Sequence, residues 1–145
     1  MIYNLVKFTI GEYPSVESIV NFLEVNNLTD IIVVPTHKLG LLHLKENSIL
    51  CSGHTTRHIY KVAKDMVVDL KKLNLKDLPF TPTVFGRRDT EWLLVEIGEI
   101  QVHFFVDTFR KENDLLERWL NPPPEDYKDW SRRLNNMFYG KNRLK

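Results

Sequence analysis

The pattern of hydrophobic and polar residues predicts strands most clearly in two neighbouring, mainly apolar stretches, residues 91–97 and 100–106. Both stretches are rich in β-branched and aromatic residues, which is typical of β-strands. Gly98 and Glu99 lie between them, and glycine in the first position of a two-residue loop favours a type II′ hairpin turn. Residues that oppose each other across a hairpin share one face of the sheet. The face predicted to lie in the core pairs Ile97 with Ile100, Val95 with Val102, Leu93 with Phe104 and Glu91 with Val106.

The opposite face of this hairpin, here called the mixed face, combines large aromatic side chains with polar ones. Exposed aromatic residues with polar neighbours often mark a surface that binds a partner. A second layer of helix that covers the face explains the same pattern equally well, so periodicity alone leaves both interpretations open. The mixed face consists of Trp92, Leu94 and Glu96 on the first strand and Phe105, His103 and Gln101 on the second.

The rest of the chain predicts alternating helices and strands. Apolar residues recur with the helical period after Ser15 and after Thr55 or Thr56, whose hydroxyl groups are suited to capping a helix. Three prolines at 122–124 end a further helix, because proline has no backbone N–H. The predicted helices are residues 16–26, 56–73, 107–120 and 125–139. The predicted strands, besides the hairpin, are residues 30–35, buried on both sides, 48–52 and 83–85, with a short strand or helical turn within 36–47.

This alternation predicts an α/β domain with a mixed β-sheet of about five strands and flanking helices. A chain of 145 residues with 43% hydrophobic content can build one real core. We place the α/β domain at residues 1–120 and a proline-led, basic, amphipathic C-terminal helix and tail at residues 121–145. No apolar run approaches the ~18 residues of a membrane span, so we expect no membrane partner.

The single Cys51 excludes a disulfide within the chain and favours a reducing compartment or the mitochondrial matrix. Residues 1–10 carry only Lys7 as a charge and match neither a secretory signal nor an Arg-rich targeting segment. A targeting segment in a longer precursor is left open.

The net charge of +1 hides an asymmetry between the C-terminal end and the rest of the chain. Residues 128–145 contain six Lys/Arg and one Asp, a net +5, whereas the rest contains 14 Lys/Arg and 18 Asp/Glu, a net −4. A basic end beside aromatic residues suits RNA, although a solvated terminal helix packed through its aromatics is the preferred interpretation. The candidate RNA contacts are Arg132, Arg133, Lys141 and Arg143, and Arg87 with Arg88 forms a second positive spot near Trp92.

The turn at residues 52–56 (SGHTT) joins a predicted strand to a helix N-terminus, a geometry that suits an anion. It matches neither GxGxxG nor GxxxxGK[ST]. A nucleotidyltransferase would also need paired acids for metal ions, and Glu96 and Glu99 fall on a strand and a turn. An enzyme of this type is therefore the less favoured alternative, and we predict neither a catalytic residue nor a cofactor.

A metal site could use Cys51, His54 and His58, with His103 or His43 as a further ligand, because catalytic zinc needs only three protein ligands. Cys51, however, lies in a predicted buried strand, where a cysteine usually serves as a small core residue. His54 lies before or at the helix cap and not within the helix. We therefore predict no metal.

Three motifs, in the order of the chain, resemble those of the iojap family, the ribosomal silencing factors. The first is the turn into the central helix, residues 51–59 (CSGHTTRHI). The second is a Trp-led hairpin, residues 92–103 (WLLVEIGEIQVH). The third starts near Arg110 and ends with residues 116–120 (LERWL). The family motif at the helix start corresponds to Ser52, Gly53, Thr55, Thr56 and Arg57.

The chain departs from the family pattern in three places. Glutamates stand at 96 and 99 where the family has aspartates, residues 36–47 lack a Ser-Ser-x-x-Asp pattern, and the segment from Pro122 exceeds the short bacterial form. Such divergence resembles a mitochondrial member, similar to the iojap-like N-terminal part of a longer fungal protein. The expected location is the mitochondrial matrix, or the cytoplasm if the chain is bacterial.

The resemblance implies a factor without enzymatic activity, on a fold similar to that of nucleotidyltransferases. Family members bind ribosomal protein fourteen of the large subunit, block subunit joining or accompany late assembly, and lie near ribosomal RNA. A plain RNA-binding module in mitochondrial gene expression is the alternative, and a homodimer is left open. The family's partner-binding tryptophan corresponds to Trp92. The expected docking residues are Trp92, Leu94, His103, Phe105, Arg87 and Arg88.

Overall fold

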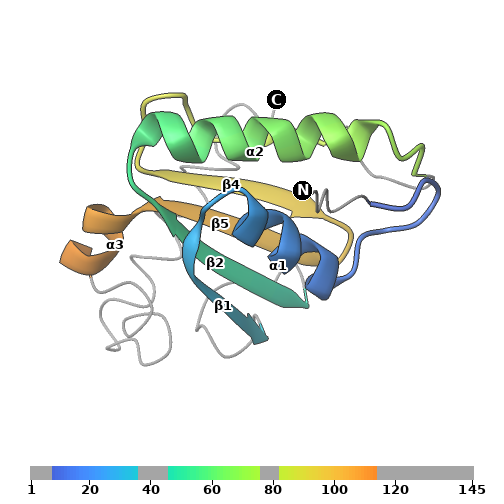
Figure 1. Ribbon diagram of the computed structural model, residues 1–145, viewed down its shortest axis with the longest axis horizontal. Coiled ribbons are helices and arrows are strands. Elements are labelled where there is room, and N and C mark those ends of the chain that lie inside the picture. The colour runs from blue at the N-terminus through green and yellow to red at the C-terminus, as the bar shows by residue number, and fades with distance from the viewer. Residues whose placement is uncertain (1–7, 36–45, 76–81, 114–145) are drawn as a thin grey trace, which may run out of the picture.

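The computed structural model of the chain describes residues 8–35, 46–75 and 82–113 (Figure 1). Within these residues, five strands form one sheet in the order β1-β2-β5-β4-β3. The predicted α/β class with a mixed sheet and flanking helices is confirmed. The strands are β1 (Thr29–Pro35), β2 (Asn47–Gly53), β3 (Val84–Phe85), β4 (Trp92–Ile97) and β5 (Ile100–Val106), and the helices are α1 (Val16–Val25), α2 (Thr56–Lys71) and α3 (Asp107–Asn113).

The hairpin of β4 and β5 has the register that the two-residue turn predicts, with Leu93 opposite Phe104 and Ile97 opposite Ile100. Gly98 in its turn has φ +55°, in the left-handed region that glycine enters without steric cost. β2 pairs with β5 in parallel, whereas the β1–β2 and β3–β4 pairs are antiparallel. The hairpin therefore forms the centre of the sheet.

Helices α1 and α2 pack against the apolar face of the hairpin and form one core with it (Figure 1). Ser15 caps α1 and Thr55 caps α2, each through a side-chain oxygen that accepts an N–H three residues later. The apolar residues that recur with the helical period in α2 are buried, and these are Ile59, Val62, Ala63, Met66, Val67 and Leu70.

Strand β1 contradicts one prediction, because it is not buried on both sides. Asp30 is exposed and the side chain of Val33 is 42% exposed. The reason is its position at the edge of the described sheet, where it pairs with β2 alone. Its register also shifts between Thr29 and Ile32, and Asp30 has φ +48°. A continuous apolar run does not by itself distinguish an edge strand from a central one.

Several predictions fall outside the described residues. These are the end of the helix predicted over residues 107–120, the helix over 125–139, the basic tail and nearly all of residues 36–47. The division into residues 1–120 and 121–145 is likewise not tested. Among the described residues, no helix has the length and apolar character needed to cross a membrane.

Candidate functional site

Trp92 and His103 lie on the mixed face of the hairpin, away from the core, and contact each other across the neighbouring strands β4 and β5. The indole Nε1–H of Trp92 donates to Nδ1 of His103 at 3.0 Å. The ring of Phe105 lies 5.3 Å from that of Trp92 and 6.0 Å from that of His103 between centroids. Because an indole can only donate, Nδ1 accepts and the imidazole is neutral. Burial supports this state, since desolvation lowers the pKa of His103 to about 3.

The aromatic side chains of the mixed face are buried within the chain and do not form an open surface. The exposed fraction is 3% for Trp92 and zero for both His103 and Phe105. Helices α1 and α2 pack on the other side of the sheet, and on this side the ring of Phe109 in α3 stacks on Phe105 at 6.5 Å. Among the described residues, Phe109 is the one whose ring stacks on this face from α3.

The polar members of the mixed face are also buried. Gln101 donates from Nε2 to the Ser48 hydroxyl on β2 at 2.9 Å, and Glu96 is 5% exposed. Glu99 is exposed in the hairpin turn. The two glutamates therefore differ in environment and lie on different elements, as their positions in the sequence indicate.

The loop between β3 and β4, residues 86–91, ends directly before Trp92, the first residue of β4. Arg87 and Arg88 are exposed, and the Thr90 hydroxyl donates to the backbone oxygen of Arg87 at 2.7 Å. The Arg88 guanidinium lies 5.5 Å from the centre of the Tyr60 ring on α2. Arg88 therefore extends towards the central helix, a contact that the sequence did not indicate.

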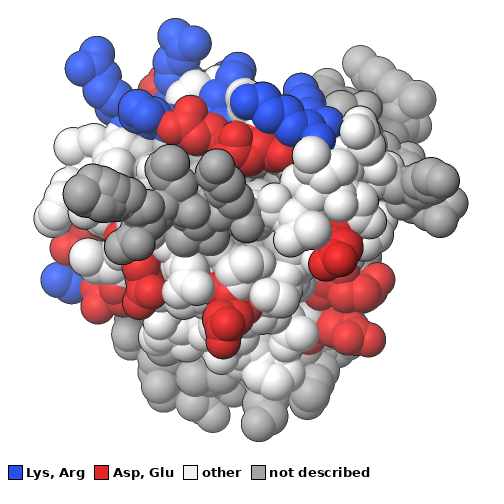
Figure 2. Space-filling model, turned by 45° about the vertical axis from the view of Figure 1, so that its right-hand side comes forward, with Lys and Arg blue, Asp and Glu red and all other residues white. Residues whose placement is uncertain are grey.

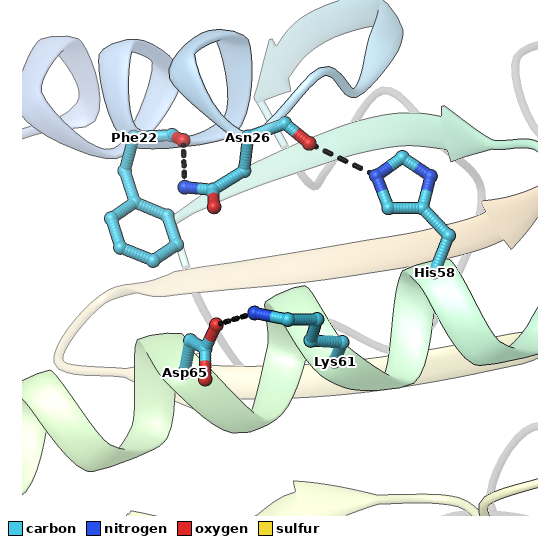
Figure 3. Close-up of polar contacts among 5 residues, drawn as sticks. All are labelled: Phe22, Asn26, His58, Lys61 and Asp65. Carbon is cyan, nitrogen blue, oxygen red and sulfur yellow. Dashed lines mark hydrogen bonds and ion pairs between the residues drawn. The ribbon is translucent and has the colours of Figure 1, made fainter.

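The family motif at the start of α2 has a structural explanation. Thr55 Oγ1 accepts the backbone N–H of His58 at 3.0 Å, and Nε2 of His58 lies 2.9 Å from the backbone oxygen of Asn26 (Figure 3). A Cβ atom on Gly53 would lie 2.7 Å from Cγ2 of Ile59. The motif thus caps α2, ties it to the end of α1 and requires glycine where the strand approaches the helix.

Arg110 connects α3 to strands β1 and β2. Its Nη1 donates to the backbone oxygen of Asp30 at 2.8 Å and to the Ser52 hydroxyl at 2.9 Å. Its guanidinium also lies 6.0 Å from the Phe105 ring centre. Burial lowers the pKa of Arg110, and the Asp30 carboxylate opposes that shift. The sequence placed Arg110 in a motif, but only the polar Ser52 within a buried strand hinted at its partner.

The candidate metal ligands do not converge in the described part of the chain, where no group of three His, Cys, Asp or Glu residues could hold an ion. Cys51 is fully buried, its thiol donates to the backbone oxygen of His103 at 3.5 Å, and burial raises its pKa. His54 stacks on His58 with centroids 6.5 Å apart. Cys51 is a core residue in this fold.

Comparison with known proteins gives the family. A sequence model described as ribosomal silencing factor during starvation, RsfS, matches residues 11–139. The chain belongs to the RsfS family. The match contains all three motifs by which the sequence resembles the iojap proteins, so that resemblance is confirmed, and it spans every described helix and strand of the RsfS fold seen here.

The relatives of this RsfS chain include mitochondrial and bacterial proteins. The mouse protein named mitochondrial assembly of ribosomal large subunit protein 1 is 24% identical over 110 residues. These residues are 76% of this chain and 47% of the mouse protein, so the chain spans about half the length of that relative. The RsfS of Haemophilus influenzae is 24% identical over 80 residues, 55% of this chain and 74% of the relative.

Chromobacterium violaceum provides both a relative and a solved structure. Its RsfS is 28% identical over 95 residues, 66% of this chain and 73% of the relative. A crystal structure of a protein from the same organism matches with a TM-score of 0.54 and 26% identity, covering 72% of this chain and 82% of the other. The α/β fold described here is therefore one that RsfS-like proteins share.

Proposed function

We propose that this chain binds the large ribosomal subunit and acts there as a silencing or assembly factor. The observation that carries the proposal is the RsfS match over residues 11–139. The names of the relatives point the same way, one to assembly of the large subunit and two to ribosomal silencing. A binding role needs no turnover, so the proposal includes neither a catalytic residue nor a cofactor.

The docking partner in this proposal is ribosomal protein fourteen of the large subunit. The exposed loop of residues 86–91 would make the first contact through Arg87, and Trp92 at its end would follow as the buried anchor. Truncating a desolvated aromatic anchor of this type costs about 2 kcal/mol or more of binding free energy. Because Trp92, Leu94, His103 and Phe105 are buried in the free chain, tight docking on them requires these side chains to become accessible.

The mechanism in this proposal is steric. Once docked on the face of the large subunit that meets the small subunit, the body of the domain occupies space that subunit joining needs. The proposed location is the mitochondrial matrix, supported by the mouse mitochondrial relative, and bacterial relatives make the cytoplasm the alternative. Ribosomal RNA near the docking site would be contacted by basic residues, adding a salt-dependent contribution.

Density-gradient sedimentation tests the proposal with purified mitochondrial and bacterial ribosomal subunits. Wild type should migrate with the large subunit and reduce joining to the small subunit when added first. Arg87→Glu should weaken this co-migration, whereas Lys111→Glu, an equally large charge change on α3, should not. Wild type that stays at the top of every gradient at low salt would overturn the proposal. A pull-down with isolated ribosomal protein fourteen tests this docking partner separately from the rest of the subunit.

A further inference from the structure

The outer side of α2 carries a straight row of basic residues. Arg57, Lys61, Lys64 and Lys71 are separated by four, three and seven residues, and these intervals bring side chains to the same side of an α-helix. At 1.5 Å per residue the row is about 21 Å long. Val68, which is 41% exposed, occupies the position between Lys64 and Lys71. We call this row with Arg88 the basic stripe.

The two flanks of the basic stripe differ. On one side lie Asp65 and Asp69, and Lys61 pairs with Asp65 at 2.8 Å while remaining 71% exposed (Figure 3). On the other side lies Tyr60, whose ring centre is 6.0 Å from Lys64 Nζ and 5.5 Å from the Arg88 guanidinium. Tyr60 therefore holds two cations from different elements beside the row, which widens the basic stripe away from the acids.

Charge is segregated across the described residues. Residues 56–72 and 86–91 together contain seven Lys/Arg and four Asp/Glu, a net +3, whereas the remaining described residues contain two Lys/Arg and nine Asp/Glu, a net −7. Figure 2 shows most basic side chains gathered along the upper edge of the molecule, where α2 lies, with acidic side chains directly below them and in scattered groups elsewhere in that view. Such a separation orients the domain towards an extended anion.

We infer that the basic stripe is a second docking surface and that it binds the phosphate backbone of double-stranded RNA. A line of cations about 21 Å long matches a ligand whose negative charges also repeat along a line. A membrane surface would instead call for apolar side chains to insert, and Val68 is the one exposed large apolar residue on α2. The inference rests on the proposed function for its source of RNA, which is the ribosome.

The position of the basic stripe makes it separate from the mixed face. Helix α2 covers the core side of the hairpin, whereas the side chains of Trp92, His103 and Phe105 lie on the opposite side of the same two strands. The row on α2 and the mixed face can therefore be occupied at the same time, and Arg88 lies in the loop between them, where it contacts Tyr60 of α2. The factor would contact ribosomal protein on one side of its sheet and ribosomal RNA on the other.

The test measures binding of the whole chain to a fluorescent double-stranded fragment of large-subunit RNA by anisotropy over a salt series. Lys61→Glu and Lys64→Glu should each lower the slope of log affinity against log salt by about 1, and together they should weaken binding at least about tenfold. Lys111→Glu is a matched control, because Lys111 is also 71% exposed and also pairs with an acid four residues away.

Three results would overturn the inference. The first is no RNA binding by wild type at low salt, and the second is an equal loss with Lys111→Glu. The third is binding of anionic phosphatidylserine vesicles that depends on Lys61 and Lys64 while RNA binding does not. The gradient experiment distinguishes the two proposals. If the chain binds RNA but never sediments with subunits, the proposed function alone is overturned. If the chain binds no RNA and its co-sedimentation is unaffected by Lys61→Glu/Lys64→Glu, the role of the basic stripe alone is overturned.

Discussion

Trp92 donates its indole hydrogen to His103 Nδ1 at 3.0 Å, and both residues are almost completely buried. The pair joins the two central strands on the face that the core does not use. Trp92→Phe keeps an aromatic ring but removes the donor that a buried acceptor needs, together with part of the buried ring volume. We expect a loss of about 1–3 kcal/mol in the free energy of unfolding.

Urea denaturation of wild type and Trp92→Phe measures this loss. Trp92→Phe in a His103→Leu background is the informative comparison, since the acceptor is then gone. In that background, Trp92→Phe should lower the free energy of unfolding by much less than it does in wild type. Equal costs in both backgrounds would mean that the hydrogen bond contributes nothing.

His103 also predicts how stability depends on pH. Its pKa falls from 6.5 to about 3 on folding, so the unfolded chain binds the proton between these values and the folded chain does not. The contribution of His103 to the free energy of unfolding is therefore fully present above pH 6.5 and is lost as the pH falls towards 3. The contribution of His103 is up to about 1.4 kcal/mol per pH unit.

His103→Gln isolates this effect, because glutamine can still accept a hydrogen bond but does not titrate. We expect the free energy of unfolding of wild type to fall more steeply than that of the variant between about pH 6 and about pH 4. Urea denaturation across this range gives the difference directly. Parallel curves for the two proteins would show that His103 is protonated to the same extent in the folded and unfolded states.

Arg110→Met should destabilise the fold although it lies outside the helix core. It removes the charged donor to Ser52 Oγ and to the backbone oxygen of Asp30. Hydrogen bonds to charged groups contribute about 1.5–3 kcal/mol each, and we expect a loss of that order. Thermal unfolding of Arg110→Met beside the exposed Lys111→Met checks it, because Lys111→Met should change stability by less than about 0.5 kcal/mol.

Gly53→Ala tests why the family motif contains glycine at the start of α2. The new methyl group would lie 2.7 Å from Ile59 Cγ2, and Ile59 is fully buried. We expect a destabilisation of about 1–3 kcal/mol, as for other overpacked cores. Gly11→Ala is the contrasting variant, since its Cβ meets nothing within 4 Å and the substitution reports only its φ of +87°.

The central part of the fold could be predicted from the sequence because local signals agree there. Strand-forming composition, a glycine turn, helical periodicity and cap residues each act over a few positions, and they predict the β4–β5 hairpin, the caps Ser15 and Thr55 and the buried side of α2 correctly. The strand order depends on contacts distant in sequence. This is why the edge position of β1 was missed.

The candidate site shows the same division. The sequence identified Trp92 and His103 as members of one face, but it could not decide whether that face is exposed, because burial depends on what packs above it. The contact of Arg88 with Tyr60 joins a loop to a helix 28 positions away. The basic stripe was overlooked because the acids on α2 and elsewhere cancel its charge in a residue count.

The position of β1 has a consequence for assembly. An outer strand presents unpaired backbone N–H and C=O groups to which a foreign strand can add. In β1 the shifted register between Thr29 and Ile32 interrupts the regular spacing of these groups, and Pro35 supplies no N–H at its end. Only a short and irregular length of backbone therefore remains for an added strand to pair with. Within the described sheet, this edge is therefore a poor template for the addition of another strand.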